Sequence, residues 1–117
     1  MPQTKPQWPS KDGLRVGHLN INSALSKISD IHSILDNSGT PFHVFGFTES
    51  RLSSVTPDND VAIPGYVTIR KDSTSLNATG LLIYIHESVN YKRLAHLEDT
   101  SVEIIWLEIK LKKISTY

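Results

Sequence analysis

The amino-acid sequence predicts an α/β fold of the mixed α+β kind, in which a mostly antiparallel sheet contains one parallel βαβ pair. Two observations support this prediction. Between residues 14 and 47, a strand-like segment, an amphipathic helical stripe and a second apolar strand follow one another, which is the order of a parallel crossover. Between residues 66 and 112, three β-branched or aromatic runs are separated by turn-rich segments, which is typical of an antiparallel meander.

The size and composition exclude several classes of protein. A chain of 117 residues holds one domain at most. Its twelve basic and twelve acidic side chains cancel, so no strongly positive field marks a nucleic-acid partner. The chain contains no cysteine and no apolar run long enough to span a membrane, which excludes disulfide scaffolds, zinc–thiolate sites and membrane spans. Residues 1–13 are interpreted as a flexible leader before a domain at 14–117.

The first strand and the helix are predicted from their apolar spacing. Apolar and polar residues roughly alternate from 14 to 21, so the strand's apolar residues are expected to face a core; these are Leu14, Val16, Leu19 and Ile21. The helical stripe has spacings of three and four, with members Ala24, Leu25, Ile28, Ile31, Ile34 and Leu35. Asn22 or Ser23 is expected to cap this helix at its N-terminus.

The end of the helix and the next strand are also marked in the sequence. Residues 37–41 contain Gly39 and Pro41, which end a helix. The nearly continuous apolar run at 43–47 indicates a strand covered on both faces and parallel to the first. Glu49 then lies just beyond the end of this strand.

The later segments predict a loop followed by three strands. Residues 50–60 have the composition of a surface loop, and 63–66 that of a turn. Strands are expected at 66–70, 80–86 and 101–112, and the last of these is apolar on both of its faces. A sheet with two apolar faces requires a second layer, and no remaining segment is expected to supply it. The sequence therefore predicts an incomplete domain.

Three polar side chains are expected to converge where the two parallel strands end. Asn20 and Asn22 follow the first strand and Glu49 follows the second, and parallel neighbours bring their carboxyl ends to one edge of the sheet. Oxygen ligands with open water positions suit Mg²⁺ better than zinc. The alternative is that the two asparagines cap the following helix and Glu49 is a solvated loop carboxylate.

Five blocks, in order, carry a resemblance to a known family. The blocks are His18–Ser23, Phe47–Leu52, Ile63–Tyr66, Arg70–Asp72 and Gly80–Ile85. Together they resemble the endonuclease domain of LINE-type (non-LTR) retrotransposons, an apurinic-endonuclease-like branch of the endonuclease/exonuclease/phosphatase superfamily. The resemblance runs from about Leu14 to about Leu111.

The resemblance implies a fold, a reaction and a cofactor. The fold would be a two-sheet α/β sandwich, of which this chain holds the N-terminal half. The reaction would be Mg²⁺-dependent hydrolysis of a phosphodiester, with DNA as the partner and the nucleus as the place of action. Glu49 would be a catalytic metal ligand and Asn20 a catalytic residue that orients the phosphate or a metal-bound water. Asn22 is a secondary candidate, because many relatives have Asp there.

Further residues are candidates for contacts with DNA. Arg51, Arg70 and Lys71 provide positive charge for phosphate contacts, although exposed solubilising charge explains them equally well. By the resemblance, the loop before the strand at 80–86 would be glycine-rich and would approach DNA closely, and Gly80 is the glycine that this chain retains there. The five histidines show no metal-binding spacing and are interpreted as structural; they are His18, His32, His43, His86 and His96.

The later motifs of the family have no counterpart in these 117 residues. They are a tyrosine within a strand, a Gly-Asp-x-Asn segment and a Ser-Asp-His segment, which together support the attacking water and position the phosphate. The sequence therefore predicts a truncated endonuclease that is inactive by itself. Two alternatives stay open: a non-catalytic module that binds a partner or associates with itself through an uncovered sheet face, and a phosphatase of the same superfamily.

Overall fold

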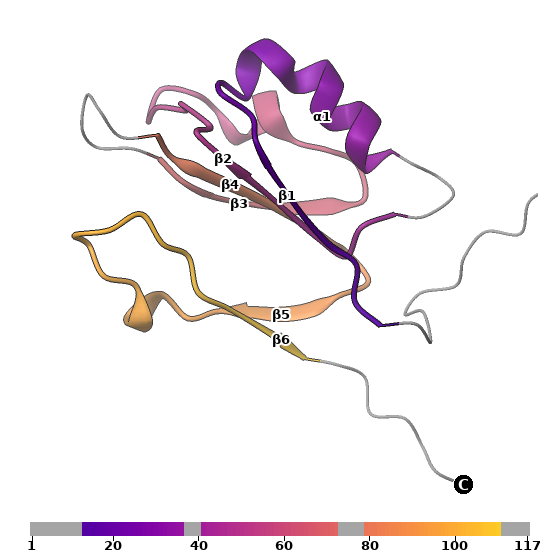
Figure 1. Ribbon diagram of the computed structural model, residues 1–117, viewed down its shortest axis with the longest axis vertical. Helices are drawn as coiled ribbons and strands as arrows, with labels where there is room; N and C mark the ends of the chain where they lie inside the picture. Colours follow the sequence, from indigo (N-terminus) through magenta and orange to yellow (C-terminus); the bar gives the residue numbers. More distant parts are fainter. Residues whose placement is uncertain (1–12, 37–40, 73–78, 111–117) are drawn as a thin grey trace, which may run out of the picture.

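The computed structural model describes residues 13–36, 41–72 and 79–110, which form two β-sheets and one α-helix (Figure 1). The first sheet has the strand order β1-β2-β4-β3, and the second pairs β5 with β6. The strands are β1 Val16–Asn20, β2 Val44–Thr48, β3 Tyr66–Lys71, β4 Leu81–His86, β5 Asn90–Arg93 and β6 Leu107–Lys110. Helix α1 spans Ile28–Leu35, and short 3₁₀ helices span Leu25–Lys27, Asp58–Val61 and Ala95–Leu97. The predicted mixed fold class is confirmed.

The pairing of the strands determines which residues share an edge of the first sheet. Strands β1 and β2 are parallel, with Val16 opposite Val44 and Asn20 opposite Thr48. Strand β4 runs antiparallel to both β2 and β3, and Leu81 lies opposite Thr48. The carboxyl ends of β1 and β2 therefore meet the start of β4 at one edge, which we call the rim.

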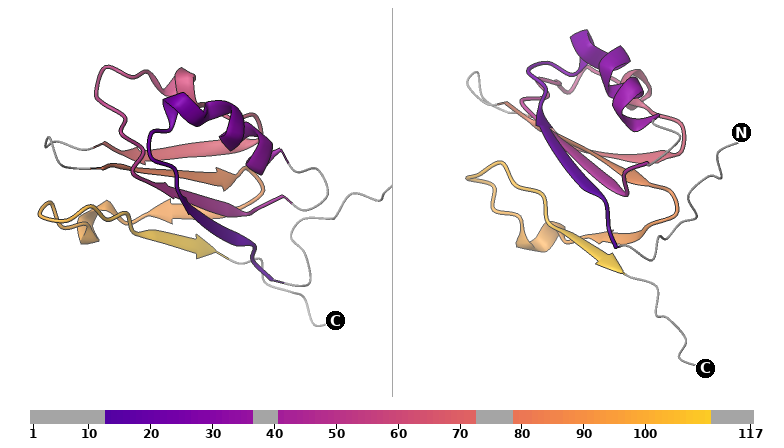
Figure 2. Two further views of the ribbon diagram at one scale, coloured as in Figure 1. Left: turned by 45° about the horizontal axis from the view of Figure 1, so that its top comes forward. Right: turned by 45° about the vertical axis from the view of Figure 1, so that its right-hand side comes forward.

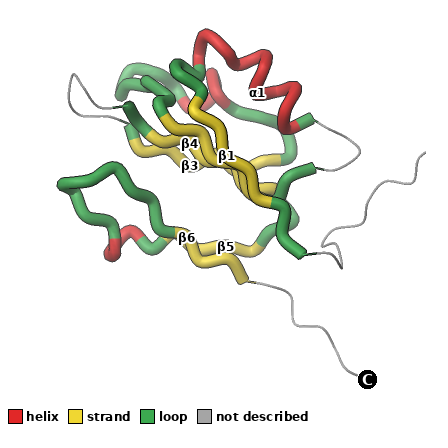
Figure 3. Tube along the Cα trace, in the orientation of Figure 1, coloured by secondary structure: helices red, strands yellow, loops and turns green. Residues whose placement is uncertain are grey.

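The main core lies between α1 and the first sheet. Figure 2 shows the helix crossing one face of the sheet, and Figure 3 shows the same layering by element type. The helix buries Ile31 and Leu35, and the sheet contributes buried aromatic rings at Phe45, Phe47 and Tyr84. The ring centroids of Phe45 and Phe47 are 4.7 Å apart. The apolar stripe of the sequence thus forms the helix side of the core except at Leu25, which is exposed in the 3₁₀ helix before α1. Burying a large apolar side chain contributes roughly 1.5–3 kcal/mol.

The opposite face of the first sheet is covered in part by β5 and β6, which lie on the side away from α1 (Figure 1). Ile69 and Ile85 on this face are buried. Val16 of β1, on the same face, is 62% exposed, and Leu14 is 40% exposed. The expectation that Leu14 and Val16 face a core was therefore wrong, because β1 is an edge strand that the small second sheet does not reach. Leu19 is also exposed, and of the four apolar residues in that segment Ile21 alone is buried.

The last predicted strand is shorter than expected and belongs to a different sheet. Residues 101–106 are not a strand, and Val102 and Trp106 are exposed. Leu107–Lys110 pairs with β5, which sequence reasoning missed because the segment Asn-Tyr-Lys-Arg lacks apolar alternation. The expectation that no segment supplies a second layer was wrong in part, since β5 and β6 begin one. Residues 111 and 112 of the predicted strand lie outside the described residues.

The helix begins without the predicted side-chain cap. Neither the 3₁₀ helix before α1 nor α1 itself has a side-chain cap, so the prediction for Asn22 or Ser23 was wrong. Instead, the amides of Ser23 and Ala24 donate to the carbonyls of Glu49 and Ser50, at 2.8 and 2.9 Å. The segment that enters the helices is thus held by the chain that leaves β2. The helix ends at Leu35, and residues 37–40, where the stop signal was predicted, lie outside the described residues, as do 1–12 of the predicted leader.

Candidate functional site

The rim brings Asn20, Asn22 and Glu49 together. Asn20 is the last residue of β1, and its side-chain Nδ2 donates a hydrogen bond to Oε2 of Glu49, the first residue after β2. This contact follows from the parallel register, which aligns Asn20 with Thr48. The structure thus places the sequence-predicted residues side by side at the edge where open α/β sheets bind ligands.

Arg51 completes the group. Its Nη2 donates to Oε1 of Glu49 at 3.1 Å, and its Nε donates to Oδ1 of Asn22 at 3.0 Å. The two side chains of the ion pair are 49% and 31% exposed, for Arg51 and Glu49 respectively. The guanidinium thus holds one oxygen from each of two chain segments, and the whole group is open to solvent.

The backbone of the rim is held in an uncommon conformation. Among the described residues, the non-glycine residues with a positive φ all lie here: Asn22 at 47°, Ser23 at 89°, Glu49 at 55° and Arg51 at 55°. A left-handed backbone costs an ordinary residue roughly 1–2 kcal/mol. Such residues cluster at functional sites, where the surrounding structure holds them in place.

Two hydrogen bonds to carbonyls just before β4 hold this backbone. The amide of Ser50 donates to the carbonyl of Gly80 at 3.3 Å, and the amide of Arg51 donates to the carbonyl of Thr79 at 2.8 Å. Glu103, from the connection between β5 and β6, in turn accepts from the Gly80 amide at 2.8 Å and from the Thr79 hydroxyl at 2.6 Å. The hydrogen bonds from Thr79 lower the pKa of the Glu103 carboxyl.

Glu103 is the rim residue that sequence reasoning missed. It lies in a segment interpreted as a strand, and nothing in the local pattern distinguishes it from a solvated glutamate. Its partners, Thr79 and Gly80, are more than twenty residues away in the chain. The contact arises because the second sheet packs beside the start of β4, and no short motif encodes it.

Gly80 is required by the protein's own backbone. Its φ is +82°, and a Cβ atom at this position would lie 2.6 Å from Oγ of Ser50. The sequence prediction assigned Gly80 to a close approach of DNA. The structure gives it a close approach to Ser50 of the same chain.

The other two predicted phosphate contacts are engaged within the chain. All five N–H donors of Arg70 are used, by the carboxylates of Asp72 and Asp58 and by the carbonyls of Ser53 and Thr56. This guanidinium anchors the 53–58 loop to the end of β3. Lys71 donates from Nζ to the carbonyl of Ile104 at 3.1 Å. In this conformation Arg51 is the predicted phosphate contact that lies in the rim.

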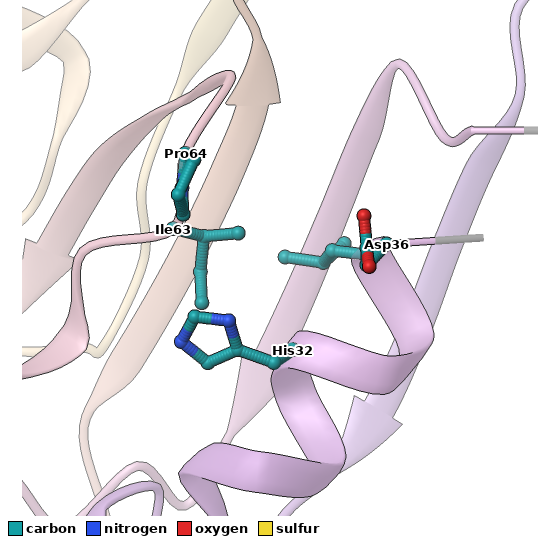
Figure 4. A pocket seen from close by; sticks show the side chains of 5 residues that line it. His32, Asp36, Ile63 and Pro64 are labelled. Carbon is teal, nitrogen blue, oxygen red and sulfur yellow. The ribbon is translucent and has the colours of Figure 1, made fainter. Parts of the chain in front are cut away.

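The histidines occupy structural positions outside the rim group. His43 is buried, its Nδ1 accepts a hydrogen bond from the Arg15 amide at 2.7 Å, and burial lowers its pKa. His18 lies within 3.3 Å of the Thr48 hydroxyl. His32 lines a pocket of about 160 Å³ with Pro64 and neighbouring residues (Figure 4). That pocket lies by the end of α1 and the start of β3, at the edge of the sheet opposite the rim.

The rim suits an open divalent-cation site rather than a closed one. In the described ranges, no three His, Cys, Asp or Glu side chains gather as a cation site. Mg²⁺ is commonly held by one or two carboxylates with several waters, and carboxamide oxygens are acceptable ligands. The Glu49 carboxylate and the side-chain oxygens of Asn20 and Asn22 meet this minimal requirement.

Comparisons with known proteins leave the family assignment open. No family model, no curated protein and no solved structure matches this chain. Within the described ranges, no helix is long and apolar enough to cross a membrane.

Proposed function

We propose that this chain is the metal- and phosphate-binding half of a phosphodiesterase domain of the endonuclease/exonuclease/phosphatase type, with DNA as its substrate. The observation that carries the proposal is the convergence of Asn20 and Glu49 at the rim, where Glu49 has a positive φ. The same two residues are those that the resemblance to LINE-type endonucleases assigns to the metal and the phosphate.

Each residue has a distinct part in this proposal. A bound Mg²⁺ would polarise the scissile phosphate and stabilise the departing oxygen. Glu49 supplies the negative charge that attracts the ion, and Asn20 holds the Glu49 carboxylate in place through its amide. Asn22 provides a neutral oxygen where a carboxylate would bind a cation more tightly. The side chain of Arg51 is close enough to meet a phosphate bound at Glu49.

The chain by itself is proposed to bind the metal without cleaving DNA. Hydrolysis requires a group that activates water, and we assign this task to none of the rim residues; the His18 ring lies 3.3 Å from the Thr48 hydroxyl. The motifs that the resemblance assigns to this step have no counterpart in these 117 residues, and the proposal for this chain is therefore limited to binding.

The experiment is a titration of the metal-free protein with Mn²⁺, comparing the original chain with Glu49→Gln. Gln keeps the size of the side chain and its ability to accept from Asn20, but removes the charge. We expect at least a ten-fold loss of affinity, because the single carboxylate is the main attraction for the ion. Removing an ion pair this exposed costs roughly 0.2–1 kcal/mol, so the melting temperature without metal should change little.

A matched control separates the rim from general surface charge. Glu108 is an exposed glutamate on β6, and Glu108→Gln should leave the Mn²⁺ affinity unchanged. If Glu49→Gln and the original chain bind Mn²⁺ equally, the proposed metal site is wrong. A plasmid-nicking assay, with Mg²⁺ present, should show no cleavage by either protein.

A second candidate function is self-association through the open part of the first sheet. It is favoured by Val16, which is 62% exposed on the face that β5 and β6 leave uncovered near β1, and by Leu14, which is 40% exposed just before that strand. Sedimentation velocity of the original chain and of Val16→Lys tests it. A dimer that Val16→Lys converts to a monomer, with no dependence on Mg²⁺, would support this function instead.

A further inference from the structure

We propose that Arg51 is an internal counter-ion that occupies two side-chain oxygens of the proposed metal site, so that a divalent cation binds only by displacing it. The inference rests on the proposed function, because it concerns the same site. Its basis is that one guanidinium contacts both Oε1 of Glu49 and Oδ1 of Asn22. Those two oxygens are among the few that the rim offers to a cation.

Both oxygens of the Glu49 carboxylate accept hydrogen bonds, so a divalent cation would compete directly with Arg51 for one of them. Oε2 accepts from the Asn20 amide, and Oε1 accepts from Arg51 at 3.1 Å. The Asn20 amide is neutral and is compatible with a cation on the other oxygen. The guanidinium is not, because two positive charges at one carboxylate oxygen repel each other. A cation at Oε1 therefore requires Arg51 to leave.

The backbone directs Arg51 toward this position. The amide of Arg51 donates to the Thr79 carbonyl at 2.8 Å, and its φ is +55°. The neighbouring lysines do not contact the Glu49 carboxylate: Lys27 donates from Nζ to the carbonyls of Ile21 at 2.7 Å and of Asn22 at 3.2 Å, and Lys71 contacts Ile104 and Glu98. Arg51 is thus the cation that the described rim presents to Glu49.

The displacement of Arg51 also implies that the metal ion binds before the phosphate. Once Glu49 and Asn22 hold a metal ion, the Arg51 guanidinium regains the two donors that it now spends on them. Guanidinium donors match the geometry of phosphate oxygens. The ligand class for the released side chain is therefore the phosphodiester anion, and metal binding and phosphate binding should strengthen each other.

The test compares Mn²⁺ binding by the full chain, Arg51→Ala and Lys92→Ala, with free Mn²⁺ measured by electron paramagnetic resonance. Arg51→Ala keeps a Cβ atom at the same positive φ, so it adds no backbone strain. Lys92 is exposed on β5, so Lys92→Ala removes the same charge at a position away from the rim. We expect Arg51→Ala to bind Mn²⁺ roughly three-fold or more tightly than the original chain, which corresponds to losing an exposed ion pair. Lys92→Ala should bind as the original chain does.

The double variant Glu49→Gln/Arg51→Ala makes the result specific to the rim, because its Mn²⁺ affinity should fall to that of Glu49→Gln. Equal or weaker binding by Arg51→Ala, with Glu49-dependent binding in the original chain, would overturn the competition and leave the metal site in place. Mn²⁺ binding that does not depend on Glu49, or no Mn²⁺ binding by any variant, would overturn both proposals. Circular dichroism of each variant verifies that it is folded before the titration.

Discussion

Gly80→Ala probes the contact that holds the rim backbone. Gly80 lies at the start of β4, with φ at +82°, and its carbonyl accepts from the amide of Ser50. An alanine Cβ would lie 2.6 Å from Oγ of Ser50, which is closer than non-bonded atoms approach. Oγ of Ser50 is itself buried and has no hydrogen-bond partner in the described residues. The substitution therefore introduces a backbone cost and a steric cost together.

The size of the effect can be worked out from these two costs. A positive φ costs alanine roughly 1–2 kcal/mol relative to glycine. Moving the Ser50 hydroxyl off its rotamer adds roughly 0.5–1.5 kcal/mol. The lower entropy of the unfolded alanine chain offsets roughly 0.4–1 kcal/mol. Gly80→Ala should thus lower the free energy of unfolding by about 2 kcal/mol and the melting temperature by about 10 °C.

The assay is urea unfolding followed by circular dichroism, on Gly80→Ala, Ser50→Ala and the double variant. Ser50→Ala removes the atom that the new Cβ would meet, so in that background Gly80→Ala should retain the backbone cost alone. The two substitutions should therefore be less destabilising together than the sum of their separate effects, by about 1 kcal/mol. Additivity to within about 0.4 kcal/mol would refute the steric reasoning.

Three further predictions concern contacts within the fold. Arg70→Met should lower the free energy of unfolding by about 3 kcal/mol, because it removes charge-assisted hydrogen bonds that anchor the 53–58 loop. Limited proteolysis should then cut this loop faster, and cleavage at the original rate would contradict that role. Tyr84→Phe should cost about 1.5 kcal/mol in thermal unfolding, because the fully buried Tyr84 hydroxyl donates to the Val61 carbonyl at 2.6 Å; a more stable variant would contradict it. The hydrogen bond from Arg93 lowers the pKa of Glu98 to about 2, so the stability that the pair contributes is present above pH 4.5 and is lost as the pH falls toward 2. Glu98→Gln should therefore flatten the decline in melting temperature between pH 4.5 and 2, and an unchanged slope would show that other groups cause it.

The fold could be predicted where local pattern and burial agree. The stripe from Ala24 to Leu35 has helical spacing, and its buried members, Ile31 among them, pack on the sheet as expected. The order of strand, helix and strand determines a parallel pair, since such crossovers return the chain in the same direction. The parallel pair then brings Asn20 to Glu49. Each step depends only on neighbouring segments of the chain, which is why the sequence alone predicts that Asn20 and Glu49 lie close together.

The prediction was wrong where a pattern has two explanations. The apolar residues at 101–106 resemble a strand, yet the chain turns at 100–102, where the Asp99 carboxylate accepts from the Ser101 amide at 2.8 Å. Beside this turn, Glu98 and Glu103 accept hydrogen bonds from the backbone amides of Trp106 and Gly80. A carboxylate that binds a distant backbone competes with strand pairing. Val16 has the alternation of a buried strand residue and is exposed, because burial depends on whether a second layer reaches that strand.

The sequence by itself therefore determined the class of fold, the parallel pair and the three polar residues that meet at its end. Only the tertiary structure decided how the charges are used. Arg51, Arg70 and Lys71 are equivalent in the sequence, but Arg70 and Lys71 are directed into the protein's own carboxylates and carbonyls, whereas Arg51 lies on Glu49 at the rim. The physical reason is that periodicity is a local property that burial imposes on a segment. The partners of a charge are instead set by the distance between segments far apart in the chain, and only folding brings those segments together.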